Sequence, residues 1–187
     1  MELYYKRLRP YEKTLPNDKG EYCCKVCGVP LHRKGGAYCG EACQNTYEIP
    51  RNWNIAKWHV SQRDKGVCAR CGVDTSLIVR QIRRYSFQYR DGGVYFDAAR
   101  MRAIRDKYEE WAEPLRQNGF VLPNISIMPH EPICLAEVDH ILPVWKGGGG
   151  CGLDNLRTLC VPCHRQVTKE QAAERAALVR VKTGKGE

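Results

Sequence analysis

The sequence predicts a small α+β fold that depends on bound metal. The chain of 187 residues contains 11 cysteines, and most of them lie in short-range pairs. The stretch from about Pro162 to Arg180 is rich in strong helix formers, and further helical patterns lie upstream. The strand part of the prediction comes from a motif between residues 137 and 164, described below.

The cysteines are spaced as zinc ligands. The four pairs are Cys24 with Cys27, Cys39 with Cys43, Cys68 with Cys71, and Cys160 with Cys163. Thiolates separated by two or three residues are typical of tetrahedral zinc sites. Cys23, Cys134 and Cys151 are left over, and an odd remainder fits metal binding better than complete disulfide pairing. We therefore expect two structural Zn²⁺ ions and a reducing, intracellular environment, in the cytoplasm or, in a eukaryote, the nucleus.

The composition favours a polyanionic partner. The chain has 30 Lys and Arg residues against 21 Asp and Glu residues, a net charge of +9. A basic balance suits nucleic acid, although alone it indicates only non-specific attraction. No apolar run approaches the length of a membrane span, and the start at Met1 lacks a signal-peptide core, so we expect a soluble protein with no membrane association.

One motif carries the chemistry. It consists of Glu137-Val138-Asp139-His140-Ile141, then Asn155, then Cys160-Val161-Pro162-Cys163-His164. Hydrolysis of a phosphodiester needs a base that activates water and a cation that neutralises charge on the phosphate and the leaving oxygen. The motif resembles the HNH endonuclease family, a group of zinc-containing ββα-metal nucleases.

The resemblance implies a β-hairpin followed by a helix, arranged around one divalent metal such as Mg²⁺ or Mn²⁺. The strands would be residues 138–141 and 157–159, and the helix would begin near Pro162, where a missing N–H costs nothing. His140 would accept the proton from water, and Asp139 and His164 would hold the catalytic metal. Asn155 would either pin the hairpin loop or complete the coordination shell.

A narrower resemblance is to the C-terminal zinc-finger and HNH region of an SNF2-type annealing helicase and endonuclease. It covers residues 138–141, 147–150, 153–160 and 163–165, together with the upstream four-cysteine finger. No helicase is expected in this chain, and residues 76–134 do not visibly match that region. The resemblance therefore implies DNA as the substrate and, as a partner, a separate motor or targeting protein.

Residues 1–50 are expected to form an arm followed by a small treble-clef zinc finger. The finger resembles the FCS-like type, with Cys24, Cys27, Cys39 and Cys43 as ligands. His32 is an alternative ligand, but four thiolates already complete a zinc shell. A structural role for the zinc, as a source of folding energy, is favoured over a separate nucleic-acid contact.

Residues 51–187 are expected to form the HNH domain, with an insertion at about 76–134. A helix over residues 52–64 leads into Gly66 and the Cys68–Cys71 knuckle, an opening that resembles zinc-containing HNH domains. The resemblance implies one zinc bound by Cys68, Cys71, Cys160 and Cys163. This zinc would fix the start of the helix that carries His164.

The insertion is a candidate DNA contact. From Arg80 to Lys107 there are eight basic and three acidic residues. Arg80, Arg83 and Arg84 are interleaved with aromatic residues, so they predict phosphate contacts beside unpaired bases. The alternative is a half-buried strand with the aromatic residues on one face. Downstream, Asp97 is a predicted N-cap, and Pro114 is expected to stop or kink the helix that follows.

Two further basic residues are predicted DNA contacts. Lys146 lies in the loop of residues 143–152, whose four consecutive glycines permit close approach to a sugar-phosphate chain, and Arg165 follows His164. The sequence thus predicts a metal-dependent DNA endonuclease. The alternatives are a non-catalytic two-zinc module that binds DNA or protein, and a purely structural zinc ribbon. The co-occurrence of Asp139, His140, Asn155 and His164 favours the enzyme, because a scaffold needs only the cysteines.

Overall fold

The computed structural model describes residues 16–32, 36–91, 97–126, 133–150 and 152–182. The first part of the predicted arm, Cys151 and the final residues of the chain lie outside these ranges, as do residues 92–96 and 127–132 of the predicted insertion. The chain divides into two compact units, one formed by Met1–Arg63 with His140–Leu156 and the other by Asp64–Asp139 with Arg157–Glu187. The predicted boundary after residue 50 is a different division and stays a prediction.

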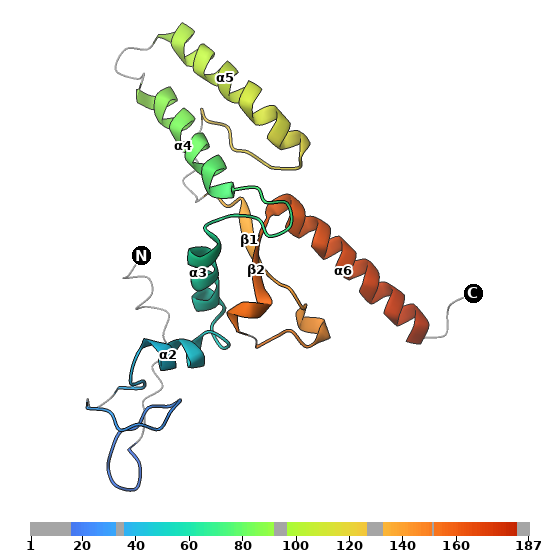
Figure 1. The fold of residues 1–187 in the computed structure, drawn as a ribbon. Coiled ribbons are helices and arrows are strands. Elements are labelled where there is room, and N and C mark those ends of the chain that lie inside the picture. The colour runs from blue at the N-terminus through green and yellow to red at the C-terminus, as the bar shows by residue number, and fades with distance from the viewer. Residues whose placement is uncertain (1–15, 33–35, 92–96, 127–132, 151, 183–187) are drawn as a thin grey trace. The chain divides into compact units, whose positions relative to one another are not determined.

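The first unit is built around two helices and a loop. Helix α2 spans Glu41–Glu48, and α3 spans Trp53–Asp64 (Figure 1). The Asn52 side chain accepts hydrogen bonds from the backbone N–H groups of Asn54 and Ile55, at 3.1 and 3.4 Å, and so caps α3. The helix buries Ile55, Ala56 and Val60. The predicted helix over residues 52–64 is confirmed.

The second unit contains a helical hairpin. Helix α4 spans Thr75–Asp91 and α5 spans Ala98–Gln117, and the two lie side by side (Figure 1). The Asp97 side chain accepts hydrogen bonds from Ala99 and Arg100 at 3.0 and 3.3 Å, so the predicted N-cap is confirmed. Most of the predicted insertion is therefore helical.

The strand alternative and the stop expected at Pro114 are both wrong, whereas a kink at Pro114 stays a prediction. Residues 80–89 lie in α4, so the alternative of a half-buried strand does not hold. Aromatic residues at alternate positions also suit a helix here, because Tyr85 and Tyr89 lie four residues apart and both pack against the core, whereas Phe87 is 64% exposed. Pro114 does not stop α5, which continues to Gln117. Only three residues follow it, so the loss of one backbone hydrogen bond falls in the final turn.

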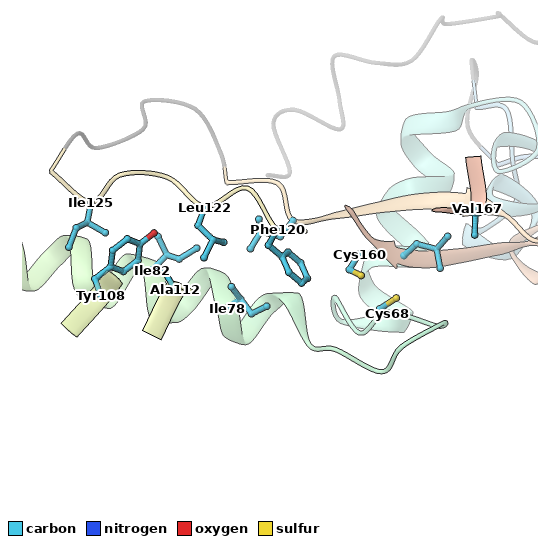
Figure 2. Close-up of a cluster of buried hydrophobic side chains, with 12 residues drawn as sticks. Cys68, Ile78, Ile82, Tyr108, Ala112, Phe120, Leu122, Ile125, Cys160 and Val167 are labelled. Atoms are coloured by element: carbon cyan, nitrogen blue, oxygen red, sulfur yellow. The ribbon is translucent and has the colours of Figure 1, made fainter. Parts of the chain in front are cut away.

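The core of the second unit joins the helical hairpin to the cysteines. Ile82, Tyr108 and Ala112 from α4 and α5 cluster with Leu122 and Ile125 of the following segment (Figure 2). The same cluster continues through Ile78 and Phe120 to Cys68, Cys160 and Val167. The predicted insertion thus supplies most of the apolar core on which the cysteine site rests.

A hairpin and a long helix complete the fold. Strand β1, Ala136–His140, pairs with β2, Leu156–Cys160, in a two-stranded sheet, and α6, Val161–Lys182, follows directly. The predicted strands and helix start are confirmed to within two residues. The division between the units crosses the hairpin, so Asp139 and Arg157 belong to the second unit and His140 and Leu156 to the first.

The predicted fold class is confirmed. The described residues form a small α+β structure with one two-stranded sheet, five α-helices and two clusters of cysteines. None of the helices in the described part of the chain combines the length and the apolar character needed to cross a membrane.

Candidate metal centres and nuclease site

Four cysteines of the second unit converge at the junction of the hairpin and α6. The ligand atoms of Cys68, Cys71, Cys160 and Cys163 all lie within 4.8 Å of one another, and the Sγ atoms of Cys71 and Cys160 are 3.7 Å apart. Four sulfurs held about 2.3 Å from a central Zn²⁺ would be about 3.8 Å apart in tetrahedral geometry. These four residues therefore fit one structural zinc.

The backbone favours a thiolate at Cys68. Burial alone would raise the pKa of this thiol, but the backbone N–H groups of Cys160, Cys71 and Arg70 outweigh burial and lower the pKa to about 6. Burial raises the pKa of Cys160, which has fewer amide donors. A cation in the centre of the cluster would offset the burial of these thiolates, because metal ligation deprotonates a coordinating thiol.

The first unit holds the second cysteine cluster. Cys24, Cys27, Cys39 and Cys43 also have all their ligand atoms within 4.8 Å of one another, with Cys39 3.5 Å from both Cys27 and Cys43. The backbone N–H groups of Cys27 and Val26 lower the pKa of Cys24 to about 6. The structure thus brings together both predicted sets of four zinc ligands. His32 belongs to neither set.

The predicted nuclease residues divide between the units. Asp139 and His164 belong to the second unit, whereas His140 and Asn155 belong to the first. Among the described residues, only the two cysteine clusters bring three or more Cys, His, Asp or Glu ligand atoms within 4.8 Å of one another. Asp139 and His164 are in no such group.

In the second unit, Asp139 and His164 each have one atom engaged by a neighbour. Arg157 Nη2 lies 3.4 Å from Asp139 Oδ2, and His164 Nδ1 lies 3.1 Å from Glu137 Oε2. Glu137 and Asp139 are two residues apart on β1, so they project from the same face of the strand. Asp139 Oδ1 and His164 Nε2 form no hydrogen bond with any described residue. Each side chain therefore keeps one donor atom for a metal.

In the first unit, the Asn155 side chain holds the loop closed. Its Oδ1 accepts a hydrogen bond from the backbone N–H of Leu142 at 2.7 Å, and its Nδ2 donates to the carbonyl oxygens of Leu142 and Gly148, both at 3.0 Å. Gly148 lies so close that an added Cβ would be 1.7 Å from the Leu142 carbonyl oxygen. Asn155 was expected either to hold the hairpin loop or to bind the metal, and these contacts support the first role.

The His140 ring faces Trp53. The two rings are stacked, with centroids 5.1 Å apart and an interplanar angle of 9°. Neither ring nitrogen of His140 forms a hydrogen bond with a described residue. The ring edge is therefore open to a water molecule or a substrate group.

The predicted DNA contacts are all accessible. Arg80, Arg83 and Arg84 are exposed on α4, and Arg165 is exposed near the start of α6. In the first unit, Lys146 is exposed, and its Nζ lies 4.9 Å from the centroid of the Trp145 ring.

Sequence reasoning gave no role to Glu137, Arg157 or Trp53. Glu137 carried a usable signal, because alternation along a strand places it on the same face as Asp139. Arg157 carried a similar signal, since it lies on the paired strand. Trp53 carried none, because its contact with His140 joins segments that are far apart in the sequence.

Comparison with known proteins supports a nuclease-type module. Residues 130–170 match the family model described as HNH endonuclease. The DNA annealing helicase and endonuclease ZRANB3 of mouse (Mus musculus) is 34% identical over 144 residues, a match covering 77% of this chain and 12% of the mouse protein. Human (Homo sapiens) ZRANB3 is 32% identical over 145 residues, covering 76% of this chain and 12% of the human protein. The chain thus spans only about an eighth of the length of these relatives.

A solved structure gives a related match. The crystal structure of the human ZRANB3 HNH domain has 28% sequence identity to this chain and a TM-score of 0.39, and the match covers 71% of this chain and 99% of that one. With the family match, the sequence relationship shows that the chain is homologous to the HNH region of ZRANB3.

Proposed function

We propose that this chain, whose residues 130–170 match the HNH endonuclease family, is a metal-dependent endonuclease that hydrolyses phosphodiester bonds in DNA. The observation that carries the proposal is the pair of open donor atoms on Asp139 and His164. Their other atoms are engaged by Arg157 and Glu137, which leaves one carboxylate oxygen and one imidazole nitrogen on residues that the family motif assigns to the metal.

This donor set fits a hard divalent ion. Mg²⁺ and Mn²⁺ take oxygen ligands and keep several waters, and Mg²⁺ is commonly bound by only one or two protein carboxylates together with substrate phosphates. Two protein donors are therefore sufficient without a closed cage. When bound, the ion would stabilise negative charge on the scissile phosphate and the leaving oxygen.

The protein's own residues would supply the proton transfer. His140 accepts a proton from water at one ring nitrogen, and the resulting hydroxide attacks phosphorus. The 3′ oxygen departs and leaves a 5′ phosphate. Glu137 Oε2 lies 3.1 Å from His164 Nδ1, and a carboxylate at that nitrogen would fix the orientation of the imidazole and leave Nε2 for the metal. Asn155 keeps the loop after His140 in one conformation.

The cysteine clusters have a structural role in this proposal. Each binds one Zn²⁺, and the ion on Cys160 and Cys163 fixes the start of α6, where His164 directly follows Cys163. A reducing compartment keeps such thiols available as ligands, so we place the protein inside the cell, in the cytoplasm or the nucleus.

DNA would be bound by the exposed basic residues. Arg80, Arg83, Arg84 and Arg165 of the second unit and Lys146 of the first would contact phosphates. The curated relatives are named as both annealing helicase and endonuclease. We therefore propose that a motor or targeting protein directs this nuclease to its substrate.

A cleavage assay tests the proposal. Supercoiled plasmid and branched DNA are incubated with the protein and Mg²⁺ or Mn²⁺, and wild type is compared with His140→Ala. We expect His140→Ala to abolish cleavage while the melting temperature and the zinc content stay unchanged, because His140 belongs to neither cysteine cluster.

The same assay separates the alternatives. Equal cleavage by His140→Ala would exclude this residue as the base or reveal a contaminating nuclease. Absence of cleavage by the wild-type protein on every substrate, combined with tight DNA binding, would instead favour the non-catalytic two-zinc binding module.

A further inference from the structure

The surroundings of His140 raise the question of what orients its ring. A general base must present one nitrogen to water within hydrogen-bond reach. Among the residues that the structure describes, none donates to or accepts from either ring nitrogen of His140. The aromatic contact of the ring is the near-parallel stack on Trp53, with ring centroids 5.1 Å apart and an interplanar angle of 9°.

A stack of this kind constrains the ring without blocking its chemistry. Rotation about the side-chain bonds would lift the imidazole off the indole, so contact between the faces restricts that rotation. Both ring nitrogens lie at the edge of the imidazole and stay open. A hydrogen bond would restrain the ring as well, but it would occupy one of these nitrogens.

Trp53 is held in turn by the anchoring of α3. The helix begins at Trp53 and buries Ile55, Ala56 and Val60 in the first unit. Near its other end, Arg63 donates from Nη1 to the Leu153 carbonyl at 2.7 Å and from Nη2 to the Leu156 carbonyl at 2.6 Å.

The helix therefore contacts the segment His140–Leu156 at both of its ends. At one end of the helix Trp53 contacts His140, and at the other end Arg63 donates to the carbonyl oxygens of Leu153 and Leu156. A helix fixed in this way can hold an aromatic ring at a constant position.

We propose that Trp53 is a positioning residue for catalysis, which holds the His140 imidazole by stacking so that its edge faces the attacking water. This inference rests on the proposed role of His140 as the base. It assigns to α3, and to Trp53 in particular, a function in the reaction beyond packing.

The experiment compares Trp53→Ala with Trp53→Phe and uses Trp58→Ala as a matched control. Trp58 lies on the same helix and is 40% exposed, close to the 42% of Trp53, but its ring contacts His59 and not His140. Each variant of the full chain, with zinc bound, is checked for melting temperature and zinc content before kinetics. A Phe ring preserves a face for stacking, so it serves as the conservative rescue.

Kinetics should separate positioning from DNA contact. We expect Trp53→Ala to lower kcat by about 10- to 100-fold with little change in KM, because a small misplacement of a catalytic group is costly. Trp53→Phe should recover most of the lost rate, and Trp58→Ala should match wild type. A raised KM with unchanged kcat in Trp53→Ala would overturn the proposal and identify Trp53 as a DNA contact.

A spectroscopic measurement tests the stack without any cleavage. The ring protons of His140, assigned by comparison with His140→Ala, should be shifted upfield by the indole in wild type. They should move downfield in Trp53→Ala and stay in place in Trp58→Ala. Unchanged ring-proton shifts in Trp53→Ala would overturn the inference even if kcat fell.

The two measurements also distinguish this inference from the proposed function. If wild type failed to cleave DNA, the catalytic role of Trp53 would fall together with the nuclease assignment, whereas the proton shifts would still report the stack. If wild type cleaved DNA and Trp53→Ala cleaved equally well, the nuclease assignment would stand and the positioning role would not.

Discussion

The two cysteine clusters share one local geometry but differ in what surrounds them. In the first unit, Cys24 N–H donates to the Val29 carbonyl and Gly28 N–H to the Cys24 carbonyl, at 2.8 and 2.9 Å, and Gly28 has φ 73°. The second unit repeats this pattern. Cys68 N–H donates to the Val73 carbonyl and Gly72 N–H to the Cys68 carbonyl, both at 2.9 Å, and Gly72 also has φ 73°. Each knuckle therefore needs glycine at its fifth position.

The difference lies in the packing. Cys68 and Cys160 are members of the apolar core of the second unit, together with side chains of α4, α5 and α6. The cluster of the first unit contains one buried cysteine, Cys24, and α2 beside it buries no residue. We therefore expect the finger to depend on a bound zinc more strongly than the cluster beside the nuclease motif, which an apolar core also supports.

The largest contrast is expected between Cys160→Ser and Cys43→Ser. Cys160→Ser removes a buried ligand that is also a core residue, so we expect loss of one zinc, a fall in melting temperature on the order of 10 °C or more, and loss of cleavage. Cys43→Ser should also release one zinc but leave the second unit folded. Zinc analysis, calorimetry and hydrogen exchange measure these effects. Equal loss of structure in the two variants would contradict the difference in packing.

A second contrast tests the core itself. Ile82→Ala should lower the free energy of unfolding by about 2–5 kcal/mol, because Ile82 is fully buried between α4 and α5. Leu77→Ala on the same helix should cost less than about 0.5 kcal/mol, since Leu77 is exposed. Denaturant unfolding measures both changes. If Ile82→Ala also speeds zinc release from Cys68 and Cys160 to a chelator, the core supports the metal site; an unchanged release rate would show that it does not.

The two cysteine clusters are expected to differ least in the pH at which they release zinc. Backbone amides lower the pKa of Cys24 and of Cys68 to about 6, so each thiolate persists above that pH and is lost as the pH falls through it. Zinc binding requires thiolates and itself lowers the pKa of a coordinating thiol, so both clusters should release zinc only at a pH below the value of about 6 that these thiols have without metal. We expect the two midpoints, followed with a zinc indicator, to agree within about one pH unit. Widely separated midpoints would show that packing, and not the shared knuckle, sets the acid stability.

The sequence predicted the local features well. The spacing of the cysteines identified the four close pairs, and the family resemblance implied which pairs form each ligand set. The N-cap at Asp97 and the start of α6 near Pro162 were predictable for a similar reason, since both depend on neighbouring residues. The hairpin was expected from the resemblance of its motif to the HNH endonuclease family.

Contacts between distant segments were not predictable in this way. Alternating aromatic residues suit either a strand or a helix, and only the packing of Tyr85 and Tyr89 against the core decides for α4. The stopping effect of Pro114 was overestimated, because the packed Ala112 and Leu115 hold the last turn in place. The stack of Trp53 on His140 and the hydrogen bonds of Arg63 depend on tertiary structure, which no local pattern encodes.

The four consecutive glycines after Lys146 are not equivalent. Gly147 and Gly150 have positive φ, whereas Gly148 has no room for even a methyl group, because Leu142 and Asn155 lie against its backbone. Lengthening or shortening this run by one residue would move a different position into that gap. The number of residues in this stretch is therefore constrained by the structure. Engineered grafts of this hairpin should keep the number of loop residues unchanged, which matters more than keeping every glycine.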